Sequence, residues 1–124
     1  MEFQKDTSFF SGRLKSVSFA VKGAVKLITT EHSVMTQFFI GIIMTILGFC
    51  MHISTTEWLF QILAIGLVMS IEGINTAVEK IADFIHPNYH ERIGFIKDIA
   101  AGAVFFAALT AIAIGCIIYV PKFL

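Results

Sequence analysis

The sequence has little charge, few cysteines and none of the glycine-rich motifs of the widespread nucleotide-binding folds. Charged residues make up 15% of the chain and the formal net charge is zero, so electrostatics imply neither a nucleic acid nor a strongly acidic partner. There is no GxxxxGK(S/T) and no GxGxxG motif, which argues against a P-loop ATPase and a protein-kinase-like site. No early apolar core with a small-residue cleavage site is present, so we expect no signal peptide. Cys50 and Cys116 lie in apolar stretches, where a thiol behaves as a small hydrophobe, and say little about the redox compartment.

Apolar residues, by contrast, are abundant. They make up 56% of the 124 residues, and the mean hydropathy is +0.82, which indicates a single domain built for a lipid bilayer. The uncharged stretches are Ser33 to Met51, Trp58 to Ile71, and Ile99 to Val120. A spanning helix needs about 20 residues, because the hydrocarbon core is about 30 Å thick and a helix rises about 1.5 Å per residue. The middle stretch has only 14 uncharged residues, so its helix must continue into the polar sequence that follows.

We therefore predict an all-α integral membrane protein that forms one domain over residues 1–124. Its transmembrane helices are expected over residues 33–52, 57–85 and 97–120. Pro87 is expected to end the second of these helices, and "HPNYHERIGF" is expected to form a polar loop.

Residues 13–30 predict an N-terminal amphipathic helix on the membrane surface. Lys15, Lys22 and Lys26 share one face of this segment at helical spacing, with apolar residues largely elsewhere. A plain basic membrane anchor and a role in handling phosphate explain that face equally well.

The basic residues also predict the orientation of the chain in the membrane. They gather before the first span (Lys5, Arg13, Lys15, Lys22, Lys26) and between the second and third spans (Lys80, Arg92, Lys97), whereas the turn from His52 to Glu57 has none. By the positive-inside rule, the N-terminus and the second loop are cytoplasmic, and the chain ends outside near Pro121 and Lys122.

The most informative stretch is "SIEGINTAVEKIADF", residues 70–84, at the cytoplasmic end of the second predicted span. Glu72, Asn75, Glu79 and Asp83 fall on one side of a helix, with Thr76 beside them. A carboxylate in the bilayer costs roughly 2.5–3.5 kcal/mol on the insertion scale, so we expect Glu72 to line a polar site rather than to face lipid. A solvated helix end is the alternative, and it is the stronger interpretation for Asp83.

The spacing along this polar stripe suggests separate roles for its members. Glu72 and Glu79 are about 10 Å apart along the axis, too far to hold one metal ion between them. Asn75 both donates and accepts hydrogen bonds, which suits a phosphate-bearing ligand. Glu31, just before the first span, could hold Mg²⁺ together with Glu79, with phosphate and water completing the coordination.

Lys97 and Asp98, at the cytoplasmic start of the third span, are further candidates for this site. Lys97 would offset the negative charge of the phosphates. The alternative for the pair is a membrane-interface anchor with a helix cap.

Three segments, "FAVKGAVKLITTEH", "EGINTAVEKIADF" and "PNYHERIGFIKDIAAGAV", resemble the small bacterial membrane lipid kinases, the prokaryotic diacylglycerol kinases and undecaprenol kinases. The resemblance implies a homotrimer in the bacterial inner membrane, with active sites shared between neighbouring chains. It also implies a reaction that uses ATP and Mg²⁺ to phosphorylate a lipid hydroxyl group.

The resemblance further implies individual roles. Glu72 would be the catalytic base, and Glu31 and Glu79 would bind Mg²⁺. The nucleotide-binding residues would be Arg13, Phe19, Glu31, Asn75, Glu79, Asn88, Tyr89, His90, Lys97 and Asp98. Some relatives have tyrosine where this chain has Phe19, which removes a hydroxyl group. Ser33, Met35 and Gln37 replace polar residues of the family pattern, so no site role is assigned to them.

Three functions remain open from the sequence. The leading one is an ATP-dependent lipid kinase that acts on diacylglycerol or undecaprenol. A small oligomeric cation channel or transporter is the alternative, although the polar stripe occupies one end of the second span and leaves its outer half apolar. A noncatalytic membrane scaffold is the third.

Overall fold

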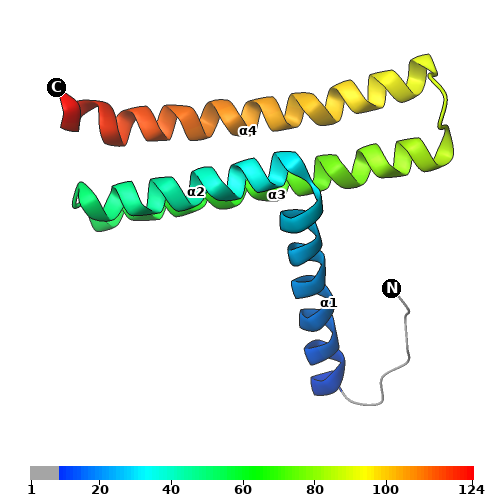
Figure 1. The fold of residues 1–124 in the computed structure, drawn as a ribbon, viewed down its shortest axis with the longest axis horizontal. Coiled ribbons are helices and arrows are strands. Elements are labelled where there is room, and N and C mark those ends of the chain that lie inside the picture. The colour runs from blue at the N-terminus through cyan, green and yellow to red at the C-terminus, as the bar shows by residue number, and fades with distance from the viewer. Residues whose placement is uncertain (1–8) are drawn as a thin grey trace.

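The computed structural model describes residues 9–124, which form four helices (Figure 1). These are α1 (Phe9–Thr30), α2 (His32–Cys50), α3 (Thr55–Ile85) and α4 (Glu91–Phe123). By length and composition, α2, α3 and α4 can each cross a membrane, which confirms the prediction of an all-α membrane protein with three such helices. Lys5, which contributed to the predicted orientation, lies outside the described residues.

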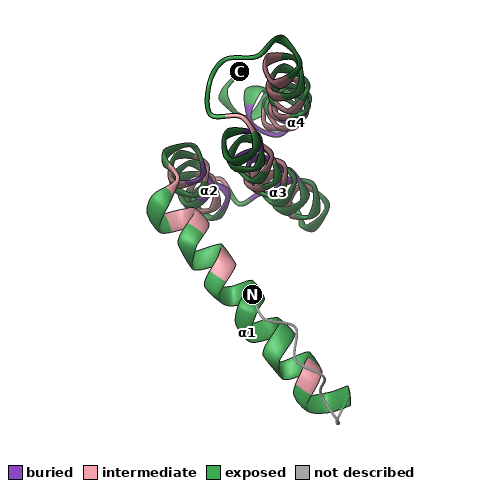
Figure 2. Cartoon of the chain, turned by 90° about the vertical axis from the view of Figure 1, so that its right-hand side faces the viewer, coloured by how far each residue is buried: buried purple, intermediate pink, exposed green. Residues whose placement is uncertain are grey.

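The three apolar helices lie alongside one another, with α3 between α2 and α4 (Figures 1 and 2). The helix α3 has 31 residues and is therefore about 46 Å long, whereas the hydrocarbon core is about 30 Å thick. The ends of α3 and α4 around the connecting loop accordingly project past the start of α2 (Figure 1). The helix α1 leaves the bundle at the start of α2 and runs across the direction of the other helices.

Local sequence signals explain where the helices begin and end. Ser54 and Glu57 form a capping box, in which the Ser54 hydroxyl accepts from the Glu57 N–H at 3.2 Å and the Glu57 carboxylate accepts from the Ser54 N–H at 2.9 Å. The helix α3 ends at Ile85, ahead of Pro87, as predicted.

The polar loop expected from His86 to Phe95 is shorter than predicted. The helix α4 already begins at Glu91, and the His90 Nδ1 accepts a hydrogen bond from the Arg92 N–H at 3.1 Å as its cap. Glu91 in the first turn suits the positive end of the helix dipole. Polar residues alone therefore do not end a helix here, and the loop comprises residues 86–90.

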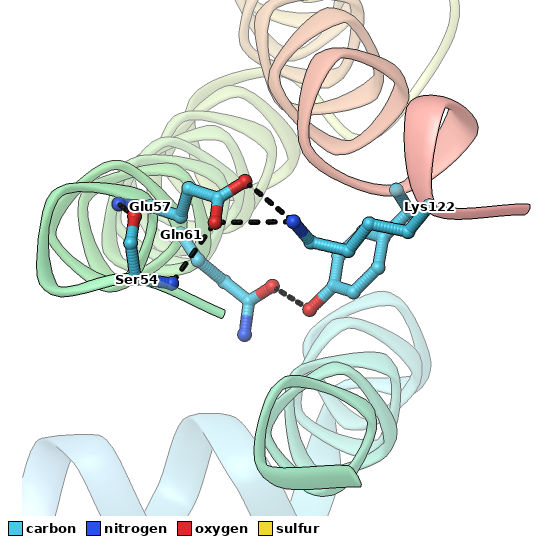
Figure 3. A network of polar contacts seen from close by, with 5 residues as sticks. Ser54, Glu57, Gln61 and Lys122 are labelled. Carbon is cyan, nitrogen blue, oxygen red and sulfur yellow. Dashed lines mark hydrogen bonds and ion pairs between the residues drawn. The ribbon is translucent and has the colours of Figure 1, made fainter. Parts of the chain in front are cut away.

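A small core and a polar network join α2, α3 and α4 beside the turn between α2 and α3 (Figure 3). Ile53, Ile118 and Tyr119 form the buried apolar cluster, with Trp58 packed against it. The polar clasp consists of Ser54, Glu57, Gln61, Tyr119 and Lys122. Its buried members are Gln61 and Tyr119. Gln61 donates to the Met44 carbonyl at 2.9 Å and accepts from the Tyr119 hydroxyl at 2.5 Å.

The polar clasp corrects the expectation that the outer half of the second span is apolar. Gln61 is 4% exposed, and Lys122 lies 3.1 Å from Glu57. These groups satisfy one another across two helices rather than lining an open path. They therefore add no support to a channel.

Most of the helical surface is exposed in the single chain (Figure 2). Large apolar side chains such as Phe39, Leu63 and Phe106 are more than half exposed. Side chains of this kind need lipid or other protein chains around them, because a continuous apolar surface of this size is unfavourable in water.

Candidate functional site

The predicted polar stripe of α3 divides into a buried part and an open part. Glu72 and Thr76 are 7% and 6% exposed, and they continue the buried line that Ala64 and Val68 begin. One position to the side, Asn75 donates its amide N–H to the Glu79 carboxylate at 3.2 Å. Glu79 itself is exposed. A shielded carboxylate thus lies about two helical turns from an open one on the same helix.

The glycine that follows Glu72 lies at a contact between helices. A Cβ atom at Gly73 would lie 3.1 Å from Leu27 Cδ1, so the last turns of α1 pack directly on α3 at this level. The Glu72 carboxylate is therefore adjacent in sequence to a residue at which α1 and α3 are in contact. Leu27 precedes Glu31 by four residues, so this contact lies close along the chain to the start of α2.

The side-chain carbonyl of Asn75 is an unused acceptor. Its Oδ1 atom is fully buried and has no hydrogen-bond partner among residues 9–124. A buried acceptor of this kind costs about 1–3 kcal/mol when it stays unsatisfied. The donor that satisfies it must come from a ligand, a water molecule or another chain, and an amide oxygen is also a ligand type that Mg²⁺ accepts.

Glu31 reaches α3 from the junction of α1 and α2. It is the one nonhelical residue between them, with φ −104° and ψ 113°, and its side chain makes no capping bond to α2 in the described chain. Its carboxylate instead lies 3.1 Å from the ammonium group of Lys80. The structure thus brings Glu31 to the turn of α3 that carries Glu79, where its ion-pair partner is Lys80.

The donor set for a metal here is small. Among residues 9–124 no group of three or more His, Cys, Asp or Glu side chains could hold a metal ion. A pair of carboxylates is sufficient for Mg²⁺ that arrives with a nucleotide, because phosphate and water oxygens complete its octahedron. Glu31, Glu79 and the unused Asn75 carbonyl fit that chemistry.

Lys97 extends from α4 to α3 and meets Asp83. The distance between the Lys97 ammonium and the Asp83 carboxylate is 2.6 Å. The sequence favoured a simple solvated role for Asp83 and did not pair it with Lys97. Asp83 lies just before the loop and Lys97 lies after it, in two helices joined as a hairpin. This placement is the sequence signal that could have predicted the ion pair. Asp98 is exposed beside Lys97.

The loop residues predicted to bind nucleotide have local structural roles as well. The Asn88 carbonyl lies 2.6 Å from the His86 Nδ1, and His90 caps α4. Tyr89 is 87% exposed, with the edge of its ring against Gly94. The loop is therefore tied down at both ends and leaves the Tyr89 ring open to a ligand or partner.

Arg13 and Phe19 are not brought to the α3 stripe within one chain. Both belong to α1, the helix that runs away from the bundle (Figures 1 and 2), and both residues are exposed. The Arg13 guanidinium lies 5.1 Å from the centre of the Phe9 ring, and Lys22 lies 5.9 Å from that of Phe19.

An apolar groove lies between α2 and α3 on the membrane side of Glu72. It has a volume of about 280 Å³, and its lining includes Phe38, Ile42, Ile65 and Met69. Met69 precedes Glu72 by less than one helical turn. The groove therefore ends near the buried carboxylate.

Comparison with known proteins adds an independent line of argument. The prokaryotic diacylglycerol kinase family matches residues 18–119. The chain is 34% identical over 108 residues to the undecaprenol kinase of Bacillus subtilis (strain 168), covering 87% of this chain and 88% of that protein. It is 30% identical over 112 residues to a diacylglycerol kinase of Synechocystis sp., covering 90% and 64%, and 25% identical over 114 residues to the diacylglycerol kinase of Escherichia coli (strain K12), covering 91% and 93%. These matches confirm the resemblance seen in the sequence, and with it the enzyme class of a membrane lipid kinase.

Proposed function

The chain belongs to the prokaryotic diacylglycerol kinase family, and we propose that it transfers the γ-phosphoryl group of ATP to the hydroxyl group of a membrane lipid. The observation that carries the proposal is the buried carboxylate of Glu72, which lies at the membrane end of the polar stripe of α3. Keeping a carboxylate in such a place is unfavourable unless it interacts with a polar group. A lipid hydroxyl group is a polar group that arrives from the membrane.

The positions of Glu72 and Glu79 along α3 support separate roles for the two residues. Counted from Thr55, Glu72 lies about 26 Å along the helix and Glu79 about 36 Å, against a hydrocarbon core of about 30 Å. Glu72 is then just inside the boundary, where a lipid headgroup hydroxyl can reach it. Glu79 is just outside, where a nucleotide can. The groove lined by Met69 offers an apolar place for the lipid tail beside Glu72.

The chemistry assigned to the chain is a single in-line displacement. The Glu72 carboxylate accepts the proton of the lipid hydroxyl group while the hydroxyl oxygen bonds to the γ-phosphorus. The bond from that phosphorus to the β,γ-bridging oxygen breaks, and ADP leaves. Such a reaction needs alignment and charge stabilisation more than covalent participation of the protein.

The remaining residues bind and orient the nucleotide. Glu31 and Glu79 would hold Mg²⁺, which supplies charge neutralisation on the phosphate oxygens when it is bound. The Asn75 amide, the Lys97 ammonium and the Asp98 carboxylate are assigned to the nucleotide, and the segment Asn88 to His90 covers it from the loop.

We further propose that the enzyme is a homotrimer whose neighbouring chains complete each site. Arg13 and Phe19 support this, because they belong to α1, which runs away from the other helices, yet they lie near nucleotide contacts of the family. The exposed apolar surface of α2 to α4 gives neighbouring chains a surface to pack on. In this arrangement α1 lies on the cytoplasmic surface of the bacterial inner membrane, with the basic N-terminal region inside.

The acceptor is diacylglycerol or undecaprenol, since relatives of both names match most of this chain. The test uses purified protein in bicelles with labelled ATP, Mg²⁺ and each lipid in turn. We expect transfer to at least one of them. Glu72→Gln should lower the rate by at least about a hundredfold, the lower range for loss of a general base, with the fold retained.

A matched control is available on the same helix. Glu57→Gln makes the same chemical change at the opposite end of α3, and glutamine still completes the capping box. Transfer should persist in this variant. Full activity of purified Glu72→Gln, or ion flux through liposomes without ATP consumption, would overturn the proposal.

A further inference from the structure

Lys80 is the basic residue closest in sequence to the proposed metal ligands, and neither the sequence argument nor the family resemblance gives it a role in the site. It directly follows Glu79 on α3, and its ammonium group lies 3.1 Å from the Glu31 carboxylate. The side chain of Lys80 is 68% exposed and that of Glu31 is 25% exposed. The contact joins the α1–α2 junction to the helix that carries Glu79.

The position of Glu31 explains why it needs such a partner. Residue 31 is extended and lies between two helices, and its carboxylate does not cap α2. A free glutamate side chain in that place would populate several rotamers, and ordering a glutamate side chain is among the larger entropic costs for any residue type. Lys80 is the ion-pair partner that the structure gives to the Glu31 carboxylate.

Electrostatics add a second reason. Bringing the Glu31 and Glu79 carboxylates to one turn of α3 places like charges near each other before any metal is present. The Lys80 ammonium, in contact with the Glu31 carboxylate, lowers that repulsion. We propose that Lys80 is a positioning residue, which holds the Glu31 carboxylate over α3 and so prepares the two-carboxylate site for the metal–nucleotide complex. This inference rests on the proposed function, because it assumes that Glu31 and Glu79 bind the metal.

The ion pair and the metal need not compete for the same atom. The Lys80 ammonium contacts Oε1 of the Glu31 carboxylate, so a metal ion would bind through the second oxygen while the ion pair is kept. In the bound state the ammonium would also lie near the phosphates, where a positive charge is favourable. Exposed ion pairs are weak, so we expect a modest gain in metal affinity.

The test measures metal binding rather than turnover. Mn²⁺ is titrated by electron paramagnetic resonance into detergent-solubilised protein that is saturated with a non-hydrolysable ATP analogue. We expect Lys80→Met to raise the Kd for Mn²⁺ about twofold to fivefold, the range that an exposed ion pair allows. Lys80→Arg should restore most of the affinity, because arginine also pairs with a carboxylate.

Two further variants make the result specific. In a Glu31→Gln background, Lys80→Met should have no additional effect, because the carboxylate that it positions is gone. Lys122→Met is the matched control, since Lys122 makes an ion pair of the same length, 3.1 Å, with Glu57 at the other end of α3. It should leave the Kd for Mn²⁺ unchanged.

The outcomes separate this inference from the proposed function. An unchanged or lowered Kd in Lys80→Met overturns the positioning role, and a lowered Kd would mean that the ammonium merely repels the metal. Equal effects of Lys80→Met with and without Glu31 would overturn it as well. If the wild-type protein transfers phosphate but Lys80→Met binds Mn²⁺ normally, only the inference fails. If the wild type neither binds Mn²⁺ with the analogue nor transfers phosphate, the proposed function fails.

Discussion

The buried hydrogen bond between Tyr119 and Gln61 gives a direct test of what holds α3 and α4 together. The substitution Tyr119→Phe removes one hydroxyl group and little else. The Gln61 side chain stays in place, because its Nε2 still donates to the Met44 carbonyl at 2.9 Å. Its Oε1 then loses the hydroxyl that lies 2.5 Å away in the wild type.

The magnitude follows from the burial of Gln61. An acceptor left unsatisfied in an apolar interior costs about 1–3 kcal/mol in soluble proteins. Hydrogen bonds between membrane helices average about 0.6 kcal/mol and reach about 1.7 kcal/mol. Because Gln61 is only 4% exposed and water has little access, we expect the upper part of the membrane range, about 1–1.7 kcal/mol. That loss lowers the folding equilibrium constant about tenfold.

The assay is reversible unfolding in mixed micelles with increasing sodium dodecyl sulfate, followed by circular dichroism. Tyr119→Phe and Gln61→Leu are measured alone and combined. Each single change removes one partner, whereas the double change leaves an apolar pair, so the double variant should be less destabilised than the sum of the two. A coupling energy within about 0.3 kcal/mol of zero would refute the reasoning, because that is the range expected for independent sites.

Two other predictions follow from single positions. Gly48→Ala would place a Cβ atom 2.7 Å from the Trp58 ring, so the ring must move. We expect the free energy of unfolding to fall by about 1–3 kcal/mol in the same assay, together with a shift in tryptophan fluorescence. An unchanged fluorescence spectrum would contradict the close contact. Asn75→Ala removes the unused buried acceptor and introduces a better helix former, so the free energy of unfolding of the ligand-free protein should rise by up to about 1 kcal/mol. The rate of phosphoryl transfer should fall at least about tenfold. Destabilisation together with full activity would contradict the assignment of the Asn75 carbonyl to a ligand.

Much of the fold was predictable because hydropathy and helix length constrain membrane proteins strongly. The three apolar stretches and the stop before Pro87 lead directly to α2, α3 and α4. The predicted start at residue 97 was too late, because the polar first turns of α4 continue the helix outside the apolar region. Hydropathy locates the part of a helix that suits lipid and does not locate its ends.

The clasp at the other end of α3 was not predicted. Gln61 stands alone among apolar residues in the sequence, and its partner Tyr119 is 58 positions away. A single polar residue in a predicted span indicates that it needs a partner, but the partner depends on how α4 packs on α3. Periodicity within one helix carries no information on that packing.

The candidate site was predicted best where its residues share a helix. Glu72, Asn75 and Glu79 follow one another at helical spacing, so their common face could be inferred from the sequence. The contacts of Lys97 and Glu31 cross between helices, and the structure gives both of them partners, Asp83 and Lys80, that the sequence argument did not foresee.

Because α3 crosses the membrane boundary as one continuous helix, it fixes the positions of its carboxylates relative to that boundary. The separation of Glu72 and Glu79 along the helix axis is about 10 Å, and it does not depend on the arrangement of the surrounding lipid. In the proposed reaction, a hydroxyl group bound at Glu72 and a phosphate bound near Glu79 would therefore meet between them, at the level of Asn75 and Thr76. A loop could not hold two reactants, one in lipid and one in water, at so constant a distance. In the proposed reaction, the acidic groups assigned to the two reactants therefore lie on one helix that is longer than the hydrocarbon core is thick.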